Sequence, residues 1–177
     1  MYFVQKKFIK VHINCRSDIP KDVDRAILIV RNPLECFLSE VNRNLITPFE
    51  YFKYAPIEAF DYYTDLDNLF FNDMLPLWTL FHQRILTRFK KPLLVIEYQK
   101  LKTNLIEEFT KIVEFLDHEM TEDITKCLQD IKVGPFQRPK RPKHEVDEIM
   151  KKIKKEHVDA FNQVYEVMVD KLKRQFQ

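Results

Sequence analysis

Short apolar runs alternate with helical apolar stripes along this chain, and their order predicts an α/β fold. Three runs predict strands, at residues 7–13, 26–31 and 92–97. The run at 26–30 is unbroken and rich in β-branched residues, which predicts a strand buried on both faces, as in a parallel sheet. The residues after 92 repeat this pattern and predict another buried strand.

Apolar residues at helical spacing predict helices around these strands. The expected helices cover residues 33–45, 67–89, 104–116, 121–131 and 144–176. The second is expected to bend at Pro76, and the last is expected to be one continuous helix with four lysines on its solvated face. The fold class is therefore α/β, a partial parallel sheet flanked by helices, with a long C-terminal helix. The length of 177 residues fits a single domain.

The junction after the strand at 26–30 carries the first candidate chemistry. Arg31 ends the strand, Asn32 suits a helix cap and Pro33 suits the first helical position. In open α/β sheets, ligands bind at the carboxyl ends of strands, and a helix start there favours anions. An arginine at this point is a fork-shaped donor suited to phosphate.

Composition narrows the function classes. The chain has 29 basic and 27 acidic residues, a net charge of +2, which argues against a nucleic-acid binder. Gly134 is its one glycine, which excludes a P-loop and a G-x-G-x-x-G dinucleotide motif. Three cysteines without a C-x-x-C pattern argue against zinc, and fit either a reducing compartment or one disulfide with an odd thiol. No apolar run is long enough for a membrane-spanning segment, and no signal peptide opens the chain.

The segment from residue 25 to 43 also resembles a known motif. A strand, R-N-P, a serine eight residues after the arginine and a closing N-R resemble the 3′-phosphate-binding motif of sulfotransferases that use 3′-phosphoadenosine 5′-phosphosulfate (PAPS). This sequence pattern is most similar to that of the sulfotransferase domain of the WSC domain-containing family. The resemblance implies that Arg31 and Ser39 hold the 3′-phosphate.

Further residues take roles from the same resemblance. Lys10 and His12 match a K-T-H-type strand end, which implies that His12 is the general base and that Lys10 neutralises the transferring sulfuryl group. Tyr98 matches a tyrosine that lies near the adenine ring. Arg138, and after it Lys140, match a basic turn that closes on the 3′-phosphate, although its usual glycine is absent. No metal is implied.

Other interpretations of these residues stay open. Arg31 could pair with a carboxylate while Ser39 is solvated, and a lone histidine such as His12 is more often a packed or surface residue. The aromatic residues at 49–63 could form an acceptor wall, but core packing is the more frequent role. The basic, proline-rich segment 134–143 could contact an acidic partner or remain solvated.

The resemblance implies transfer of a sulfuryl group from PAPS to a hydroxyl of a carbohydrate or protein acceptor, with no nucleic acid involved. It also implies a Golgi or other membrane location through a segment upstream of this chain. The family's 5′-phosphosulfate loop, a P-x-S-G-x-x-W-like segment, is not found in the sequence, so the domain is expected to be partial and weak or inactive alone. The alternatives are an inactive fragment or pseudoenzyme that binds nucleotide or partners, and an unrelated helical interaction protein.

Overall fold

The structure is a computed structural model that describes residues 23–45, 55–130 and 141–176. Its described sheet has two parallel strands, β1 (Ala26–Val30) and β2 (Leu93–Glu97), paired in register from Ala26 opposite Leu93 to Val30 opposite Glu97. The α/β class and these two strands are confirmed. The strand expected at 7–13 lies outside the described residues.

The strand β1 differs from its prediction in one respect. The side chains of β2 are buried from Leu93 to Ile96, whereas in β1 only Val30 is fully buried and Ile29 is 50% exposed. The prediction that β1 is buried on both faces is therefore wrong. An apolar run indicates that a segment forms a β-strand. It does not indicate how much of each face of that strand the neighbouring elements cover.

The helix α1 (Pro33–Leu45) begins as its sequence predicts. The Leu34 backbone N–H donates to Asn32 Oδ1 at 2.9 Å, which is the expected cap, and Pro33 takes the first helical position. The apolar face of α1 is buried through Leu34, Phe37 and Val41. This face packs against the core, so the opposite face carries Glu35 and Ser39.

The segment between α1 and β2 consists of η2 (Ile57–Tyr62), α2 (Leu66–Asn68), the π-helical η3 (Leu69–Met74) and α3 (Leu75–Arg88). Just before Pro76, where the sequence predicts a bend, the chain forms η3, in which the Leu75 N–H donates to the Phe70 carbonyl five residues earlier. Pro76 follows at the start of α3, where a missing N–H is tolerated. Phe60, Phe70 and Trp78 are buried in the core, whereas Tyr62 is 80% exposed. The aromatic residues at 49–54 lie outside the described residues.

After β2 the chain forms α4 (Tyr98–Thr103), α5 (Leu105–Phe115) and α6 (Glu122–Asp130). Thr121 is a polar residue suited to a helix cap, and its Oγ1 caps α6 by accepting from the Ile124 N–H at 3.2 Å. Asn104 stands at the N-cap position of α5, but its side chain makes no capping bond and donates to Glu107 instead.

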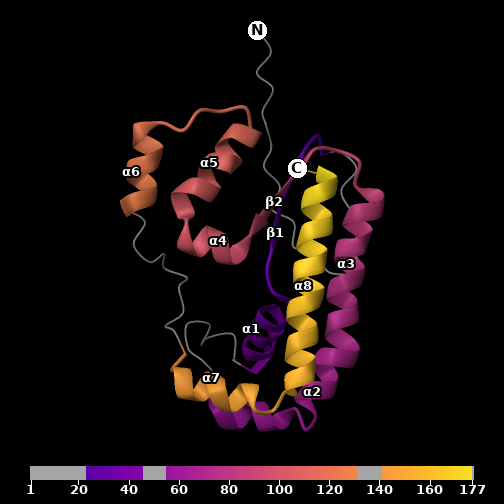
Figure 1. Cartoon of the computed structure of the whole chain (residues 1–177). Coiled ribbons are helices and arrows are strands. Elements are labelled where there is room, and N and C mark those ends of the chain that lie inside the picture. Colours follow the sequence, from indigo (N-terminus) through magenta and orange to yellow (C-terminus); the bar gives the residue numbers. More distant parts are fainter. Residues whose placement is uncertain (1–22, 46–54, 131–140, 177) are drawn as a thin grey trace.

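The C-terminal region is two helices, α7 (Lys143–Met150) and α8 (Lys155–Phe176), so the single long helix predicted for 144–176 is wrong. At the break, the Lys154 N–H donates to Asp67 Oδ1 at 3.0 Å, and Ile153 is buried. This bond replaces a helical one and turns the chain, so that α7 lies across the end of α8 (Figure 1).

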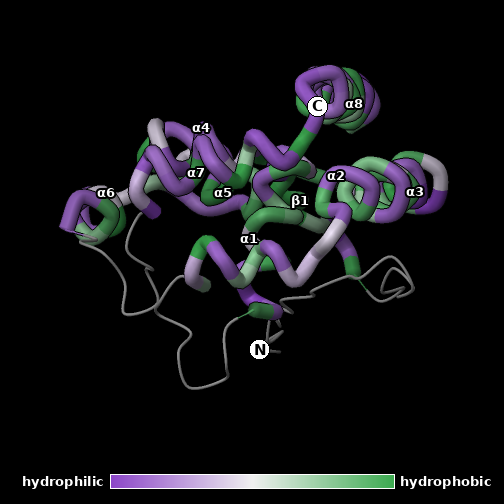
Figure 2. The backbone as a smooth tube through the Cα atoms, turned by 90° about the horizontal axis from the view of Figure 1, so that it is seen from below, coloured by the Kyte–Doolittle hydropathy of each residue, from purple (hydrophilic) through white to green (hydrophobic). Residues whose placement is uncertain are grey.

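The core lies between the strand β1, the helix α1 and the long pair α3 and α8, which run side by side (Figure 1). In Figure 2 the central strand β1 has the hydrophobic colour, whereas the surrounding helices carry both colours. None of the described helices is long and apolar enough to cross a membrane.

Candidate functional site

Two predicted site residues meet at the carboxyl ends of the parallel strands. Arg31 is the first residue after β1, and Tyr98 is the first residue after β2. Because Val30 pairs with Glu97, the next residue on each strand falls at the same edge of the sheet. The Arg31 guanidinium carbon lies 4.8 Å from the centroid of the Tyr98 ring, a cation–π contact. The structure thus brings Arg31, the residue expected to bind the 3′-phosphate, into contact with Tyr98, the residue expected to lie near the adenine ring.

Arg31 also pairs with a carboxylate, as the alternative interpretation expected. Its Nε donates to Glu35 Oε2 at 3.1 Å, and Gln99 Nε2 donates to Glu35 Oε1 at 2.6 Å. Both side chains of the ion pair are about one-third exposed. Such i,i+4 pairs contribute only about 0.3–0.5 kcal/mol, whereas hydrogen bonds to a charged phosphate contribute about 1.5–3 kcal/mol. A phosphate can therefore displace or share this partner.

Ser39 lies in α1, half-buried, four residues after Glu35. Residues four apart lie on the same face of a helix, so Ser39 is one turn beyond Glu35 on that face. Because Arg31 contacts Glu35, Ser39 lies one helical turn beyond the partner of Arg31.

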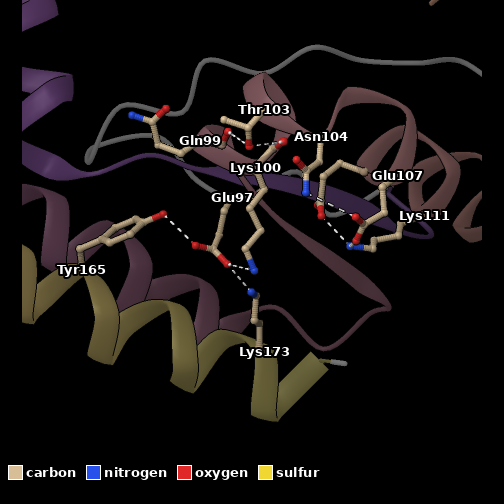
Figure 3. A network of polar contacts seen from close by, with 10 residues as sticks. Glu97, Gln99, Lys100, Thr103, Asn104, Glu107, Lys111, Tyr165 and Lys173 are labelled. Carbon is tan, nitrogen blue, oxygen red and sulfur yellow. Dashed lines mark hydrogen bonds and ion pairs between the residues drawn. The ribbon is translucent and has the colours of Figure 1, made fainter.

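A partly buried carboxylate, that of Glu97, connects three elements beside this position (Figure 3). Glu97, at the end of β2, accepts from Lys173 Nζ, pairs with Lys100 Nζ at 3.1 Å and accepts from the Tyr165 hydroxyl at 3.4 Å. Burial would raise the pKa of Glu97, but the hydrogen bonds from Lys173 and Lys100 outweigh it and lower the pKa. Burial, and then the charge of Glu97, raise the pKa of Tyr165, which therefore stays a neutral donor.

The thiol of Cys36 lies close to the same junction. Its Sγ donates to the Arg31 carbonyl at 3.8 Å. Burial raises the pKa of Cys36, although the Arg31 charge opposes this shift. A neutral thiol is a poor nucleophile, so the arrangement gives Cys36 a packing role.

Among the hollows that the described residues form, two lie away from the strand ends. One, of about 460 Å³, is lined by Ala55, Pro56, Ile57, Glu58, His144, Glu145 and Glu148. The other, of about 240 Å³, is lined by Asp61, Tyr63, Thr64, Asp65, Leu66 and Lys152. Neither hollow includes Arg31, Ser39 or Tyr98. The remaining predicted site residues, Lys10, His12, Arg138 and Lys140, lie outside the described residues.

One comparison with known proteins decides the family. A family model for the sulfotransferase domain matches residues 5–176, nearly the whole chain. The chain belongs to the sulfotransferase family. Sulfotransferases move a sulfuryl group from a donor to an acceptor, so an acceptor substrate of some kind is implied. No solved structure gives a significant match to this sulfotransferase.

The sulfotransferase match covers every predicted site residue, from Lys10 to Lys140, without testing their roles. Within the described ranges, no three His, Cys, Asp or Glu side chains are grouped so that they could hold a metal ion.

Sequence reasoning missed the residues that support Arg31 and Tyr98. Glu35 had a visible signal, because an acid four residues after an arginine in a helix start predicts an ion pair. Glu97 had a weaker signal, because it is the one acidic residue in the apolar strand β2 and stands at its end. Its partners Tyr165 and Lys173 stand 68 and 76 residues later, and no spacing rule reaches them.

Proposed function

We propose that this sulfotransferase transfers a sulfuryl group from PAPS to a hydroxyl of a carbohydrate or protein acceptor, with Arg31 as the anchor of the donor's 3′-phosphate. The observation that supports this most strongly is the position of Arg31. It stands at the carboxyl end of a parallel strand, before a capped helix and against the Tyr98 ring. This combination favours an aromatic base joined to a phosphate.

When the donor binds, Arg31 exchanges its weak ion pair with Glu35 for stronger hydrogen bonds to the 3′-phosphate. Arg31 reaches Glu35 through Nε, and its terminal amino groups form the two-pronged donor that matches a phosphate. Ser39 supplies a hydroxyl donor one turn further along the same face of α1. Tyr98 places an aromatic ring beside this phosphate, where the adenine of the donor would lie.

The transfer step rests on residues that the sequence resemblance supplies. His12 removes the proton of the acceptor hydroxyl as its oxygen bonds to the sulfur. The bond from sulfur to the 5′-phosphate oxygen breaks, and 3′,5′-adenosine bisphosphate leaves. Lys10 offsets the negative charge that develops on the sulfuryl group and the leaving oxygen. Arg138 and Lys140 add positive charge around the 3′-phosphate.

The finer family assignment belongs to the same proposal. The R-N-P and N-R wording supports a position near the WSC domain-containing sulfotransferases. A Golgi or other membrane location follows from that similarity alone and stays a prediction.

Isothermal titration with 3′,5′-adenosine bisphosphate tests the anchor. We expect saturable binding by the wild-type chain and a loss of about 10- to 100-fold in affinity for Arg31→Ala. The matched control is Arg25→Ala, which removes an arginine at the other end of β1, where it pairs with Asp117 at 2.8 Å. This control should bind within twofold of wild type. A folded wild-type chain that does not bind would overturn the proposal.

A second measurement separates an enzyme from a binding module. An enzyme incubated with PAPS and carbohydrate or tyrosine-containing peptide acceptors should release 3′,5′-adenosine bisphosphate in step with sulfated product, at a low rate because the sequence has no P-x-S-G-x-x-W-like segment. Binding of the bisphosphate without such turnover would instead support the nucleotide-binding alternative.

A further inference from the structure

The ring of Tyr98 is contacted by two cations. The Arg31 guanidinium carbon lies 4.8 Å from the ring centroid, and Lys102 Nζ lies 5.5 Å from it. The two charges therefore lie within about one Debye length of each other, ~10 Å at 0.1 M salt, and they repel. Two cations drawn to one neutral ring leave positive charge at this point of the surface.

Nearby carboxylates neutralise the other cations more fully than they neutralise Lys102. Lys100 and Lys173 both pair with Glu97, and Arg31 pairs with Glu35. The contact that the structure gives Lys102 is with the ring, and its side chain is exposed. The named residues at the strand ends thus amount to four cations and two carboxylates, an excess that suits an anionic ligand.

The backbone under Lys102 is held in place, although its side chain is exposed. Lys102 belongs to α4, which begins directly after Glu97. The pair from Lys100 to Glu97 and the hydrogen bond from Gln99 to Glu35 tie α4 to the end of β2 and to α1 (Figure 3 shows Glu97, Gln99 and Lys100). The backbone of Lys102 is therefore fixed beside Arg31. Only the flexible side chain of Lys102 has to move to contact a ligand.

We propose that Lys102 is a second cation for the 3′-phosphate of the donor, binding it together with Arg31 across the Tyr98 ring. This inference rests on the proposed function. A phosphate at the edge of the ring, within reach of both flexible side chains, would offset their repulsion. Binding it would break no ion pair that the structure gives Lys102. The resemblance assigns no role to this position.

Calorimetry with three nucleotides tests the inference. Lys102→Ala should weaken binding of 3′,5′-adenosine bisphosphate and of adenosine 3′-monophosphate about 3- to 10-fold at 50 mM salt. It should change binding of adenosine 5′-monophosphate less than twofold, because that ligand lacks the 3′-phosphate. Lys102→Arg should restore most of the affinity, since it keeps the charge. The matched control, Lys126→Ala, removes an exposed lysine of α6 and should leave all three affinities unchanged.

Each outcome bears on one proposal. If Arg31→Ala loses the bisphosphate while Lys102→Ala binds like Lys126→Ala, this inference is wrong and the proposed function stands. An equal loss for the 3′- and 5′-monophosphates would also overturn it, since Lys102 would then act through general charge. A wild-type chain that binds none of the nucleotides would overturn the proposed function first.

Discussion

Two arginines flank α1, and they differ in how completely the protein satisfies them. Arg31, before the helix, is about one-third exposed and makes one ion pair through Nε with Glu35, beside the Tyr98 ring. Arg141, which reaches the other end of α1, has a side chain only 10% exposed. Arg31 is therefore accessible to a ligand, whereas Arg141 stabilises the fold.

Arg141 is enclosed by partners from several elements. Its Nη1 donates to Glu145 at 2.8 Å, and its Nη2 donates to Asn42 Oδ1 at 3.0 Å and to the Ala55 carbonyl at 2.7 Å. The guanidinium also lies 5.2 Å from the Phe60 ring centroid. Asn42 in turn accepts from the Ala55 N–H at 3.1 Å, so this arginine closes a network around the end of α1.

The contrast teaches that burial and the number of partners, and not residue type, decide what an arginine does here. Removing a buried, fully bonded cation leaves several acceptors without a donor, which costs stability. Removing a cation that is one-third exposed and makes one weak ion pair costs little stability but takes away a ligand contact.

The largest expected effect is the loss of Arg141. Arg141→Ala should lower the free energy of unfolding by about 2–4 kcal/mol, because the buried acceptors on Asn42 and Ala55 lose their donor. Urea denaturation followed by circular dichroism measures this. The control is Arg174→Ala. Arg174 pairs with Asp170, and its side chain is 79% exposed. This substitution should change the free energy of unfolding by less than about 0.5 kcal/mol. Equal effects of the two substitutions would remove the basis of the comparison.

The pH dependence of stability sharpens the contrast between buried and open groups. Burial lowers the pKa of His82 to about 4, although its hydrogen bond to the Trp78 carbonyl opposes the shift. Because the folded pKa lies below the unfolded value near 6.5, the unfolded chain binds more protons between these values. His82 therefore contributes stability that is full above pH 6.5 and is lost as the pH falls toward 4, about 3 kcal/mol in all.

Denaturation at a series of pH values tests this directly. The slope between pH 6.5 and pH 4 should be shallower in His82→Gln, which cannot titrate. An unchanged slope would show that His82 is not the titrating group.

The partly buried carboxylate of Glu97, beside the site, should have a smaller effect. Glu97→Gln keeps the shape of the side chain but removes its charge, and it should cost about 1–2 kcal/mol of unfolding free energy. The control, Glu166→Gln, changes an exposed acid on α8 and should be neutral. A neutral result for Glu97→Gln as well would mean that Lys173 and Lys100 do not depend on the charge of Glu97.

The parts of this molecule that local spacing controls could be predicted, and the parts that distant contacts control could not. The strand ends, the Asn32 cap and the Thr121 cap depend on neighbours a few residues apart. The break before α8 could not be predicted, because Ile149, Met150 and Ile153 continue the helical stripe across it. It depends on Asp67, 87 residues away from Lys154.

The candidate site shows the same division. The position of Arg31 at a strand end followed from the sequence, and its contact with Tyr98 required the register of two strands. The burial of Asn42 could not be predicted, since the donor that bonds its side chain, Arg141, stands 99 residues later. The roles of Lys10, His12, Arg138 and Lys140 stay predictions.

The smallest expected effect concerns the partner of Arg31. Glu35→Gln should raise the affinity for 3′,5′-adenosine bisphosphate about two- to fivefold at low salt, because it removes a negative charge beside the bound phosphate. The amide oxygen still accepts from Arg31 and keeps it in place. Calorimetry at 50 mM and 300 mM salt should show the gain shrinking as salt rises. A loss of affinity would mean that the charge of Glu35 is needed to orient Arg31.

The most direct test of the account is the preference for a 3′-phosphate. The affinity for 3′,5′-adenosine bisphosphate divided by that for adenosine 5′-monophosphate isolates the contribution of that phosphate. Wild-type protein should show a ratio of about 100, and Arg31→Ala should reduce it to below about 10, whereas Arg25→Ala should leave it unchanged. A ratio that stays the same in Arg31→Ala would contradict the claim that this guanidinium binds the 3′-phosphate.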